Sequence, residues 1–277
     1  MPNTARAMSR IIFKSLGSGS CGNCYYLAIE EDNGIRIPVL IDAGVSPRRF
    51  KKEMAFHGIS ADEVKGILIT HDHMDHIRSL GSYCKHYRWP VWTTGKLHRA
   101  LAGHTMTRLH SAPYIRELED GWNELVPGRI KARWFEVPHD ATQTVGYAIM
   151  LDDFKFVIMT DIGAMTNDAL AYASQADTVV IESNYDLEML RNGPYPVELQ
   201  DRICMGNGHL SNAQCARAIK EFFHEGLSYV FLCHLSEHNN TPELALECSA
   251  ESITPPTRLI ALPRERSSEL FSLSLCQ

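Results

Sequence analysis

The sequence predicts an α/β fold in which two mixed β-sheets pack face to face, with helices on their outer sides. The first observation behind this prediction is the order of the elements, because strands and hairpins are followed by a helix twice along the chain. The second is that 277 residues, 44% of them hydrophobic and 22% charged, suit a globular protein with a large core. With no repeat or linker in the sequence, we expect one domain over 1–277 with irregular tails at 1–9 and 264–277.

The first half of the chain is expected to begin with a hairpin. Asn33-Gly34 lies between two apolar runs in CYYLAIEEDNGIRIPVLIDAG, which is a strong hairpin signal. SPRRFKKEMAFHGIS then predicts a helix with Ser46 as N-cap, Pro47 at the first position and Gly58 as its end. VKGILIT and PVWTT predict two short strands, and 97–128 is irregular and carries no prediction.

The second half repeats the pattern of strands followed by helices. IKARWFEVPHD predicts a strand, and TVGYAIMLDDFKFVIMTDIG predicts a hairpin that turns at Asp152-Asp153. TNDALAYASQ predicts a helix, ADTVVIESNYD and LSYVFLCHLS predict buried strands, and TPELALECSAE begins another helix. The clearest helix is SNAQCARAIKEFFHEG, with a capping box of Ser211 and Gln214 and an end at Gly226.

Composition excludes several classes of protein. No apolar run approaches the roughly 20 residues that span a bilayer, so no membrane association is expected. The N-terminal segment lacks the apolar core of a signal peptide, and the eight cysteines follow no disulfide framework, which together favour a cytoplasmic location with reduced thiols. A net charge of −6 argues against a protein that coats nucleic acid, but not against an enzyme that holds a nucleic acid end through metal ions and a local basic patch.

Histidine and aspartate recur where apolar strands end. Four strands end in THDHMDH, VPHD, MTDIG and LCHLS, and each supplies His or Asp at its C-terminal end. Five histidines and two carboxylates form a ligand set suited to two divalent first-row metal ions, of which Zn or Mn fit best and Fe is also compatible. The predicted ligands are His71, His73, Asp75, His76, His139, Asp161 and His234.

The spacing also suggests how the ligands divide between two ions. Alternation along an extended segment places residues 71 and 73 on one side, and Asp75 and His76 would follow toward a second ion. One ion would take His71, His73 and His139, the other would take Asp75, His76 and His234, and Asp161 would bridge them. Two ions about 3.5–4 Å apart can bind a water or hydroxide, lower its pKa and stabilise the charge of a displacement.

THDHMDH resembles the His-x-His-x-Asp-His signature of the metallo-β-lactamase superfamily, whose fold is an αββα sandwich with a dinuclear site at one edge. The resemblance extends from about Ile11 to Leu262, with the later ligands in the family's order. It implies that His139 is the third histidine of the first ion, Asp161 the bridging aspartate and His234 the last histidine, with Asp42 of LIDAG supporting the site.

Longer segments resemble the YycJ/WalJ branch of this superfamily. These segments are SLGSGSCGNCYYL, TDIG, ESNYD, GPYPVELQDRICMGNGHLSN and CHLSEHNN. The resemblance implies a metal-dependent nuclease that degrades DNA from 5′ to 3′ with a metal-bound hydroxide, so a DNA end is the expected partner. No obligate protein partner is evident from the sequence.

The resemblance assigns roles to further residues. By similarity to the tRNA 3′-processing nucleases, His209 of GNGHLSNAQ would be a general acid with Glu182 as its orienting partner; the alternative is a helix-entry histidine bonded to backbone. Asp75 is expected to be a catalytic residue as well as a metal ligand. Its presence in the cluster and the GHLSN element both favour phosphodiester hydrolysis over lactam or thioester hydrolysis. Three candidates for binding substrate at the border of the site are Asn23, Ser183 and Asn184.

Two other functions stay open on the sequence. A small cyclic or alkyl phosphodiester could be hydrolysed by the same ions in a narrower pocket, and the net acidity mildly favours this alternative. A redox or sensor domain like the superfamily's di-iron members is less compatible, because those proteins normally carry a flavodoxin-like domain for which this chain has no room.

Overall fold

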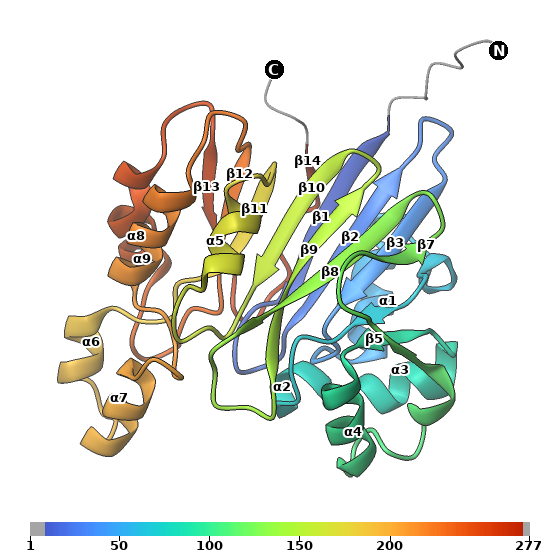
Figure 1. Ribbon diagram of the computed structural model, residues 1–277, viewed down its shortest axis with the longest axis horizontal. Helices are drawn as coiled ribbons and strands as arrows, with labels where there is room; N and C mark the ends of the chain where they lie inside the picture. The colour runs from blue at the N-terminus through green and yellow to red at the C-terminus, as the bar shows by residue number, and fades with distance from the viewer. Residues whose placement is uncertain (1–8, 274–277) are drawn as a thin grey trace.

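Two mixed β-sheets form the centre of the protein in a computed structural model that describes residues 9–273 (Figure 1). Within these residues the first sheet has seven strands in the order β14-β1-β2-β3-β4-β5-β6, and the second has seven in the order β13-β12-β11-β10-β9-β8-β7. The first sheet comprises β14 (Phe271–Leu273), β1 (Arg10–Gly17), β2 (Cys24–Glu30), β3 (Arg36–Ile41), β4 (Ile67–Leu68), β5 (Val91–Thr93) and β6 (Ile115–Glu117). The second comprises β13 (Arg258–Ala261), β12 (Tyr229–Cys233), β11 (Thr178–Glu182), β10 (Phe154–Met159), β9 (Thr144–Leu151), β8 (Ile130–Val137) and β7 (Asn123–Val126).

Helices cover the outer face of each sheet, as the sequence predicts (Figure 1). The first sheet is covered by α1 (Pro47–Ala55), α2 (Met74–Ile77), α3 (Leu80–Tyr87) and α4 (Gly95–Gly103). The second is covered by α5 (Asn167–Ala173), α8 (Asn212–Phe222) and α9 (Pro242–Ser249), while α6 (Leu187–Asn192) and α7 (Val197–Cys204) extend beside its lower end. Short 3-10 turns lie at Ala61–Glu63, Ala112–Tyr114 and Ala250–Ser252. Within the described part of the chain, every helix is too short or too polar to cross a membrane.

The main core lies between the two sheets and is rich in aromatic rings. The ring of Phe13 on β1 lies 5.4 Å from that of Phe156 on β10 and 4.9 Å from that of Phe231 on β12. A second apolar cluster lies between the first sheet and its helices, and a third lies between the second sheet and its helices. Such buried apolar faces stabilise the layers by about 25 cal/mol per Å² removed from water, and they hold the strand ends in fixed positions.

The predicted turns and caps are largely confirmed. Gly34 takes the left-handed conformation at the first hairpin (φ +82°), and Asp152 does so at the second (φ +53°). The side chain of Ser46 accepts a hydrogen bond from Arg49 N at the start of α1, and the capping box of Ser211 and Gln214 is present on α8.

Three predicted boundaries are wrong. Helix α1 ends at Ala55, and Gly58 (φ +66°) lies in the turn that follows it. Helix α8 ends at Phe222 instead of Gly226, because Phe223 adopts an extended conformation (ψ 137°) and the His224 ring turns to the backbone oxygen of Ala176, 3.1 Å away. The tail expected at 264–277 contains a strand, since β14 pairs antiparallel with β1, with Phe13 opposite Phe271. Most of the other expected tail, 1–9, lies outside the described residues.

Candidate metal centre

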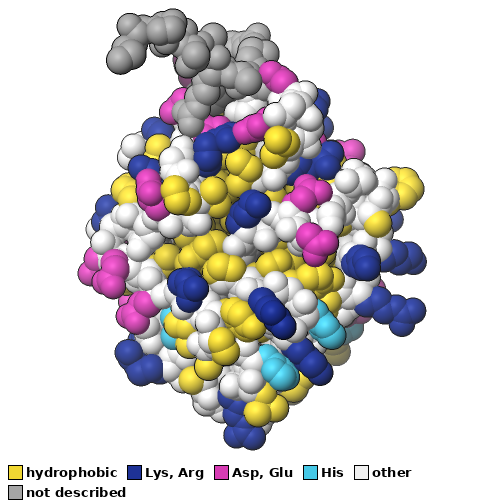
Figure 2. Space-filling model, turned by 90° about the vertical axis from the view of Figure 1, so that its right-hand side faces the viewer, with side chains coloured by type: hydrophobic (Ala, Val, Ile, Leu, Met, Phe, Trp, Pro, Cys, Tyr) yellow, Lys and Arg dark blue, Asp and Glu magenta, His cyan; other side chains and the backbone are white. Residues whose placement is uncertain are grey.

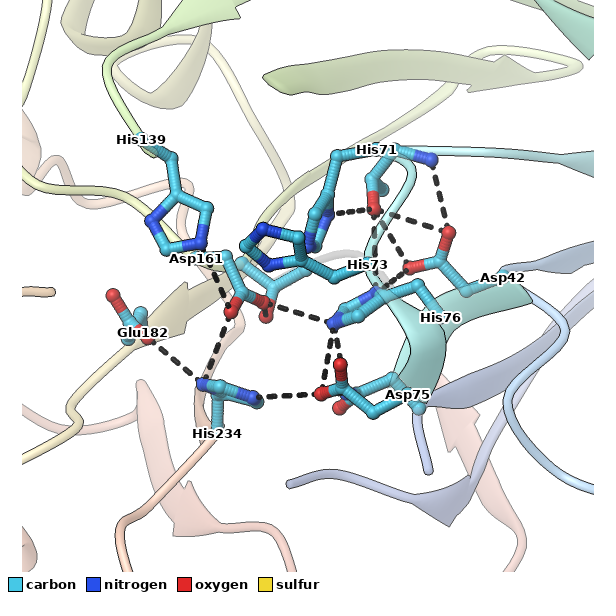
Figure 3. Close-up of polar contacts among 12 residues, drawn as sticks. Asp42, His71, His73, Asp75, His76, His139, Asp161, Glu182 and His234 are labelled. Atoms are coloured by element: carbon cyan, nitrogen blue, oxygen red, sulfur yellow. Dashed lines mark hydrogen bonds and ion pairs between the residues drawn. The ribbon is translucent and has the colours of Figure 1, made fainter. Parts of the chain in front are cut away.

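The predicted ligands meet at one edge of the sandwich, where strands of both sheets end (Figures 1 and 3). The loop after β4 supplies His71 and His73 and leads into α2, which carries Asp75 and His76. The second sheet supplies the rest from the ends of β8, β10 and β12, namely His139, Asp161 and His234. Each sheet therefore contributes part of the cluster, although the segments are far apart in the sequence.

The first group comprises His71, His73 and His139, whose ligand atoms lie within 4.8 Å of one another. His139 Nδ1 donates to the backbone oxygen of Gly208 (2.8 Å), and His71 Nδ1 lies 3.0 Å from the Thr70 hydroxyl. The Nε2 atoms of both rings are buried, and neither has a hydrogen-bond partner within residues 9–273. Burial lowers the pKa of both histidines, which favours the neutral imidazole that a metal ion requires.

The second group comprises Asp75, His76 and His234, again with ligand atoms within 4.8 Å. His76 Nε2 lies 3.5 Å from the Asp75 carboxylate, and His234 Nε2 lies 3.6 Å from the same oxygen. Burial opposes a charge on His234, but the carboxylates of Asp161, Asp75 and Glu182 outweigh it and raise its pKa to about 10.

Asp161 lies between the two groups. One carboxylate oxygen is 3.1 Å from His76 Nε2, and the other is 3.8 Å from His139 Nε2. Burial would raise the pKa of this carboxyl, but the neighbouring imidazoles of His234 and His76 hold it well below its ordinary value. This position between the groups is the one the sequence predicts for a bridging ligand.

Asp42 supports the cluster from beneath, at the end of β3. Its carboxylate accepts hydrogen bonds from the Thr70 backbone (2.9 Å) and from the Thr70 hydroxyl, and it lies 2.7 Å from His76 Nδ1. Because the Thr70 hydroxyl donates to Asp42, it accepts the proton of His71 Nδ1. The bonds therefore fix His71 and His76 with protonated Nδ1 atoms and with Nε2 turned toward the cluster.

Glu182, at the end of β11, is shared by two histidines. Its Oε1 lies 2.8 Å from His209 Nδ1 and 3.0 Å from His234 Nδ1. Its Oε2 accepts from the backbone N–H groups of Ile162 (3.0 Å) and Leu210 (3.1 Å). Burial disfavours a charged His209, but the Glu182 carboxylate outweighs burial and raises its pKa. The sequence interpretation of Glu182 as an orienting partner agrees with these contacts.

Three of the site residues adopt a backbone conformation that side chains other than glycine rarely take. The φ angles of Asp42, Asp161 and His234 are 62°, 56° and 54°. Each such residue costs of order 1–3 kcal/mol, and such outliers cluster at functional sites. Here they aim three side chains from three strand ends at one point.

A cavity of about 330 Å³ opens onto the cluster. One wall is formed by α7 and the turn before it, which contribute Tyr195, Leu199 and Arg202. The full set of lining residues is Ser20, His73, Asp75, His139, Asp140, Asp161, Asn184, Tyr195, Leu199, Arg202, Ile203, Gly208, His209 and His234.

The three predicted substrate-binding residues are placed differently from one another. Asn184 lines the cavity and donates to the backbone oxygen of His234 (2.8 Å). Asn23 is buried behind the cluster, where its amide lies 3.0 Å from Asp75 and 2.8 Å from His76 Nε2. The structure does not bring Ser183 to the cavity, because its side chain is buried and its hydroxyl donates to Asn212 (2.7 Å).

Several residues at the site were missed by the sequence reasoning. Thr70 and Asp140 directly adjoin predicted ligands, so the strand-end pattern could have included them. Tyr195 reaches the cavity from the turn between α6 and α7, and Arg202 from α7. No helix was predicted in this region, although Asp186 caps α6 by accepting from Met189 N (2.9 Å).

Comparisons with known proteins agree with this fold and cluster. Residues 38–231 match the family model described as a beta-lactamase superfamily domain. Exodeoxyribonuclease WalJ of Streptococcus pneumoniae is 33% identical over 86% of this chain and 87% of its own, and exodeoxyribonuclease YycJ of Bacillus anthracis is 32% identical over 84% and 85%. Among solved structures, the metallo-beta-lactamase fold protein YhfI from Bacillus subtilis superposes with a TM-score of 0.68 at 13% identity, covering 94% of this chain and 99% of that one.

The solved structure confirms the predicted αββα sandwich, and the two relatives confirm the branch suggested by the sequence motifs. From the match over most of its length, the chain belongs to the metallo-β-lactamase superfamily, in the branch that contains the WalJ and YycJ proteins.

Proposed function

We propose that this metal-dependent hydrolase is a DNA exonuclease that uses two divalent ions and removes nucleotides from 5′ ends. One observation carries the proposal: His71, His76, His139 and His234 each have Nδ1 anchored to an oxygen, which turns Nε2 toward the cluster. The Nε2 atoms of His76 and His139 lie 3.1 and 3.8 Å from Asp161, and that of His234 lies 3.6 Å from Asp75. This is the arrangement in which neighbouring groups orient metal-binding imidazoles.

The donor set fits two ions. The buried Nε2 atoms of His71, His139 and His234 lack hydrogen-bond partners within the described residues, and a divalent ion would satisfy them. The first ion would be held by His71, His73 and His139, the second by Asp75, His76 and His234, and both by Asp161. Nitrogen and carboxylate ligands suit Zn or Mn, and also Fe. When bound, two such ions activate water as a nucleophile and stabilise negative charge on phosphate oxygens.

The remaining chemistry falls to side chains of the chain itself. His209 lines the cavity, and Glu182 holds its Nδ1, so its Nε2 can donate a proton to the oxygen that leaves phosphorus. Glu182 acts as a positioning residue that fixes the tautomer and favours the protonated ring. Asp75 contributes as a ligand on the side of the second ion.

The cavity wall supports a nucleic acid end as substrate. Tyr195 and Leu199 offer an aromatic and an apolar surface of the kind on which bases stack, and Arg202, although paired with Asp140, keeps most of its side chain exposed beside them. The volume of about 330 Å³ is near the lower end of the roughly 300–1,000 Å³ of ligand sites, which suits one nucleotide and not a duplex. The names of the WalJ and YycJ relatives support the choice of DNA, and the family resemblance supports the 5′-to-3′ direction.

A second candidate is the hydrolysis of a small phosphodiester. The small cavity favours this alternative because it is large enough for a small diester. The net charge of −6 also favours it, because an acidic protein attracts a long polyanion such as DNA less strongly.

The test begins with purified protein that is stripped of metal and reloaded with Zn or Mn. Hydrolysis of a 5′-phosphorylated DNA duplex is measured beside hydrolysis of bis-p-nitrophenyl phosphate, with Asp161→Ala and His209→Ala as controls. Progressive shortening from the 5′ end, abolished by Asp161→Ala, is the expected result. Shortening from the 3′ end would overturn the direction, and turnover of the small diester with intact DNA would replace the exonuclease proposal with the second candidate.

A further inference from the structure

Residues 76–116 are strongly basic in a chain that is acidic overall. This segment contains seven Lys and Arg residues and no Asp or Glu, whereas the chain carries a net charge of −6. Five of these basic residues are exposed on α3, on α4 or beside them, and we call them the α3–α4 basic face. The face consists of Lys85, Arg88, Lys96, Arg99 and Arg108.

The cations of this face are not neutralised by neighbouring carboxylates. None of the five forms an ion pair with any residue in the range 9–273. The opposite side of the cavity differs, because Arg191 pairs with Asp201 (2.8 Å) and Arg202 pairs with Asp140. The cation that lines the cavity, Arg202, is therefore paired with a carboxylate, whereas the five cations of the α3–α4 basic face are not paired with any described residue.

The helices that carry these cations are rigidly packed. Helix α3 buries Leu80 and Tyr83, and α4 buries Leu97 and Leu101. Lys96 and Arg99 are three residues apart on α4, so they are neighbours on one helix surface and repel each other. Arg88, at the C-terminal cap of α3, takes a left-handed conformation (φ 59°) that favours glycine. The Arg88 N–H caps α3 by donating to the backbone oxygen of Cys84 (3.1 Å), but the charged groups of these side chains form no ion pair among residues 9–273 that would stabilise the fold, which points to a role in binding.

The α3–α4 basic face adjoins the metal centre. Only Arg78 and Ser79 separate α2, which carries Asp75 and His76, from α3. The hydroxyl of Thr94, the N-cap of α4, bonds Gln143 (2.5 Å), in the loop that carries His139. Figure 1 shows α2, α3 and α4 along the lower edge of the molecule. Figure 2 looks onto this side, where Lys and Arg recur across the lower half and Asp and Glu lie mainly above and at the left edge.

We propose that the α3–α4 basic face binds the phosphate backbone of the DNA whose end enters the cavity. This inference rests on the proposed function and adds the surface that holds the substrate outside the active site. The cavity accommodates about one nucleotide, so the rest of the polyanion lies on the surface. The chain as a whole carries a net charge of −6, and the α3–α4 basic face is a part of its surface that attracts phosphate.

The experiment compares two variants that remove the same charge from different faces. The first is Lys85→Gln/Lys96→Gln/Arg99→Gln, and the matched control is Lys155→Gln/Arg217→Gln/Lys220→Gln, whose exposed side chains lie on β10 and α8. Metal-loaded full-length protein is titrated with 5′-phosphorylated duplex DNA that has phosphorothioate linkages to slow cleavage. Fluorescence anisotropy gives Kd over a series of salt concentrations, and bis-p-nitrophenyl phosphate turnover is measured beside it.

We expect the first variant to bind more weakly than wild type and its log Kd to depend less steeply on log salt, by about one for each phosphate contact that is lost. The control is expected to bind within about twofold of wild type, since substitutions of distant surface charges act weakly. Turnover of the small diester is expected to be equal in all three proteins, because this substrate is too short to reach the face.

Equal loss of affinity in the two variants would overturn the assignment of the face, and so would an unchanged salt dependence in the first variant. Both results leave the proposed function standing if the wild type still shortens DNA. A wild type that neither binds nor cleaves DNA would overturn the inference and the proposed function together.

Discussion

The carboxylate of Glu182 lies 2.8 Å from His209 Nδ1 and 3.0 Å from His234 Nδ1, so one buried group links the proposed general acid to a proposed metal ligand. Two backbone N–H groups, of Ile162 and Leu210, hold the other oxygen of this carboxylate. Such a group cannot turn away from either histidine without leaving buried donors unpaired. Substitutions at Glu182 should therefore affect proton transfer and metal binding together.

We expect Glu182→Gln to lower kcat for DNA about 10²-fold, because His209 loses the charge that favours its protonated form. We also expect metal affinity to fall about tenfold or more, since the amide supports His234 less well. Steady-state kinetics at saturating metal separates the two effects. In the Glu182→Gln/His209→Ala double variant the losses in kcat should not add, because the two residues act as one unit. Additive losses would contradict the assigned link.

Asp42→Asn is expected to weaken metal binding about 10–100-fold while the protein stays folded, because Asp42 orients His76 directly and His71 through Thr70. Competition with a chromogenic chelator measures the affinity, and circular dichroism checks the fold. The matched control is Asp32→Asn in the exposed turn of the first hairpin, which should bind metal as wild type does. Equal affinities in the two variants would show that Asp42 does not position the ligands.

Removal of metal is expected to lower the stability of the whole sandwich, because the ligands come from both sheets. Free metal at 100 times its Kd stabilises a native site by about 2.7 kcal/mol, which corresponds to a Tm shift of several degrees for a chain of this size. Differential scanning fluorimetry with and without chelator measures the shift. The Asp161→Ala variant should lose most of the metal-induced Tm shift. A Tm shift as large as that of the wild type in this variant would argue against Asp161 as a ligand shared by both ions.

Gly44→Ala is expected to destabilise the site. A Cβ atom at Gly44 would clash with the backbone oxygen of Asp75 and approach Asn23 N to 2.5 Å, so the two segments beside the cluster would have to separate. Overpacking of this kind costs about 1–3 kcal/mol. Gly103→Ala is the control, because no atom lies within 4 Å of its added Cβ. Urea denaturation and metal content distinguish the variants, and a Gly44→Ala protein with wild-type stability and metal content would refute the steric argument.

The sequence predicts that these His and Asp side chains come together, because most of them follow an apolar strand within a few residues. His71, His139 and His234 can be located by that rule alone, since parallel and mixed sheets bring strand ends to a shared edge. The capping box of Ser211 and Gln214 is similarly local, and it appears as predicted. Such features are recoverable because each signal lies within a few residues of the structure that it specifies.

The parts that could not be predicted depend on distant contacts. Phe271 pairs opposite Phe13. The segment FSLSL alternates apolar and polar residues from Phe271 on, which is a strand signal, but nothing local shows that its partner is β1, more than 250 residues earlier. Ser183 and Asn184 are adjacent, yet only the second reaches the cavity, because the first bonds Asn212 of α8. Tyr195 lies between two short helices, α6 and α7, which depend for their stability on packing more than on helix propensity.

The pairing of β14 with β1 also bears on how the protein is made. During synthesis β1 leaves the ribosome long before β14, whose first residue is Phe271. At about 5–20 residues per second, the unpaired edge of β1 is exposed for roughly ten seconds to a minute. A bare strand edge is a template for pairing with a second nascent chain. Translation speed between β1 and β14, and any chaperone that covers Arg10–Gly17, therefore influence how much of the protein reaches the native state.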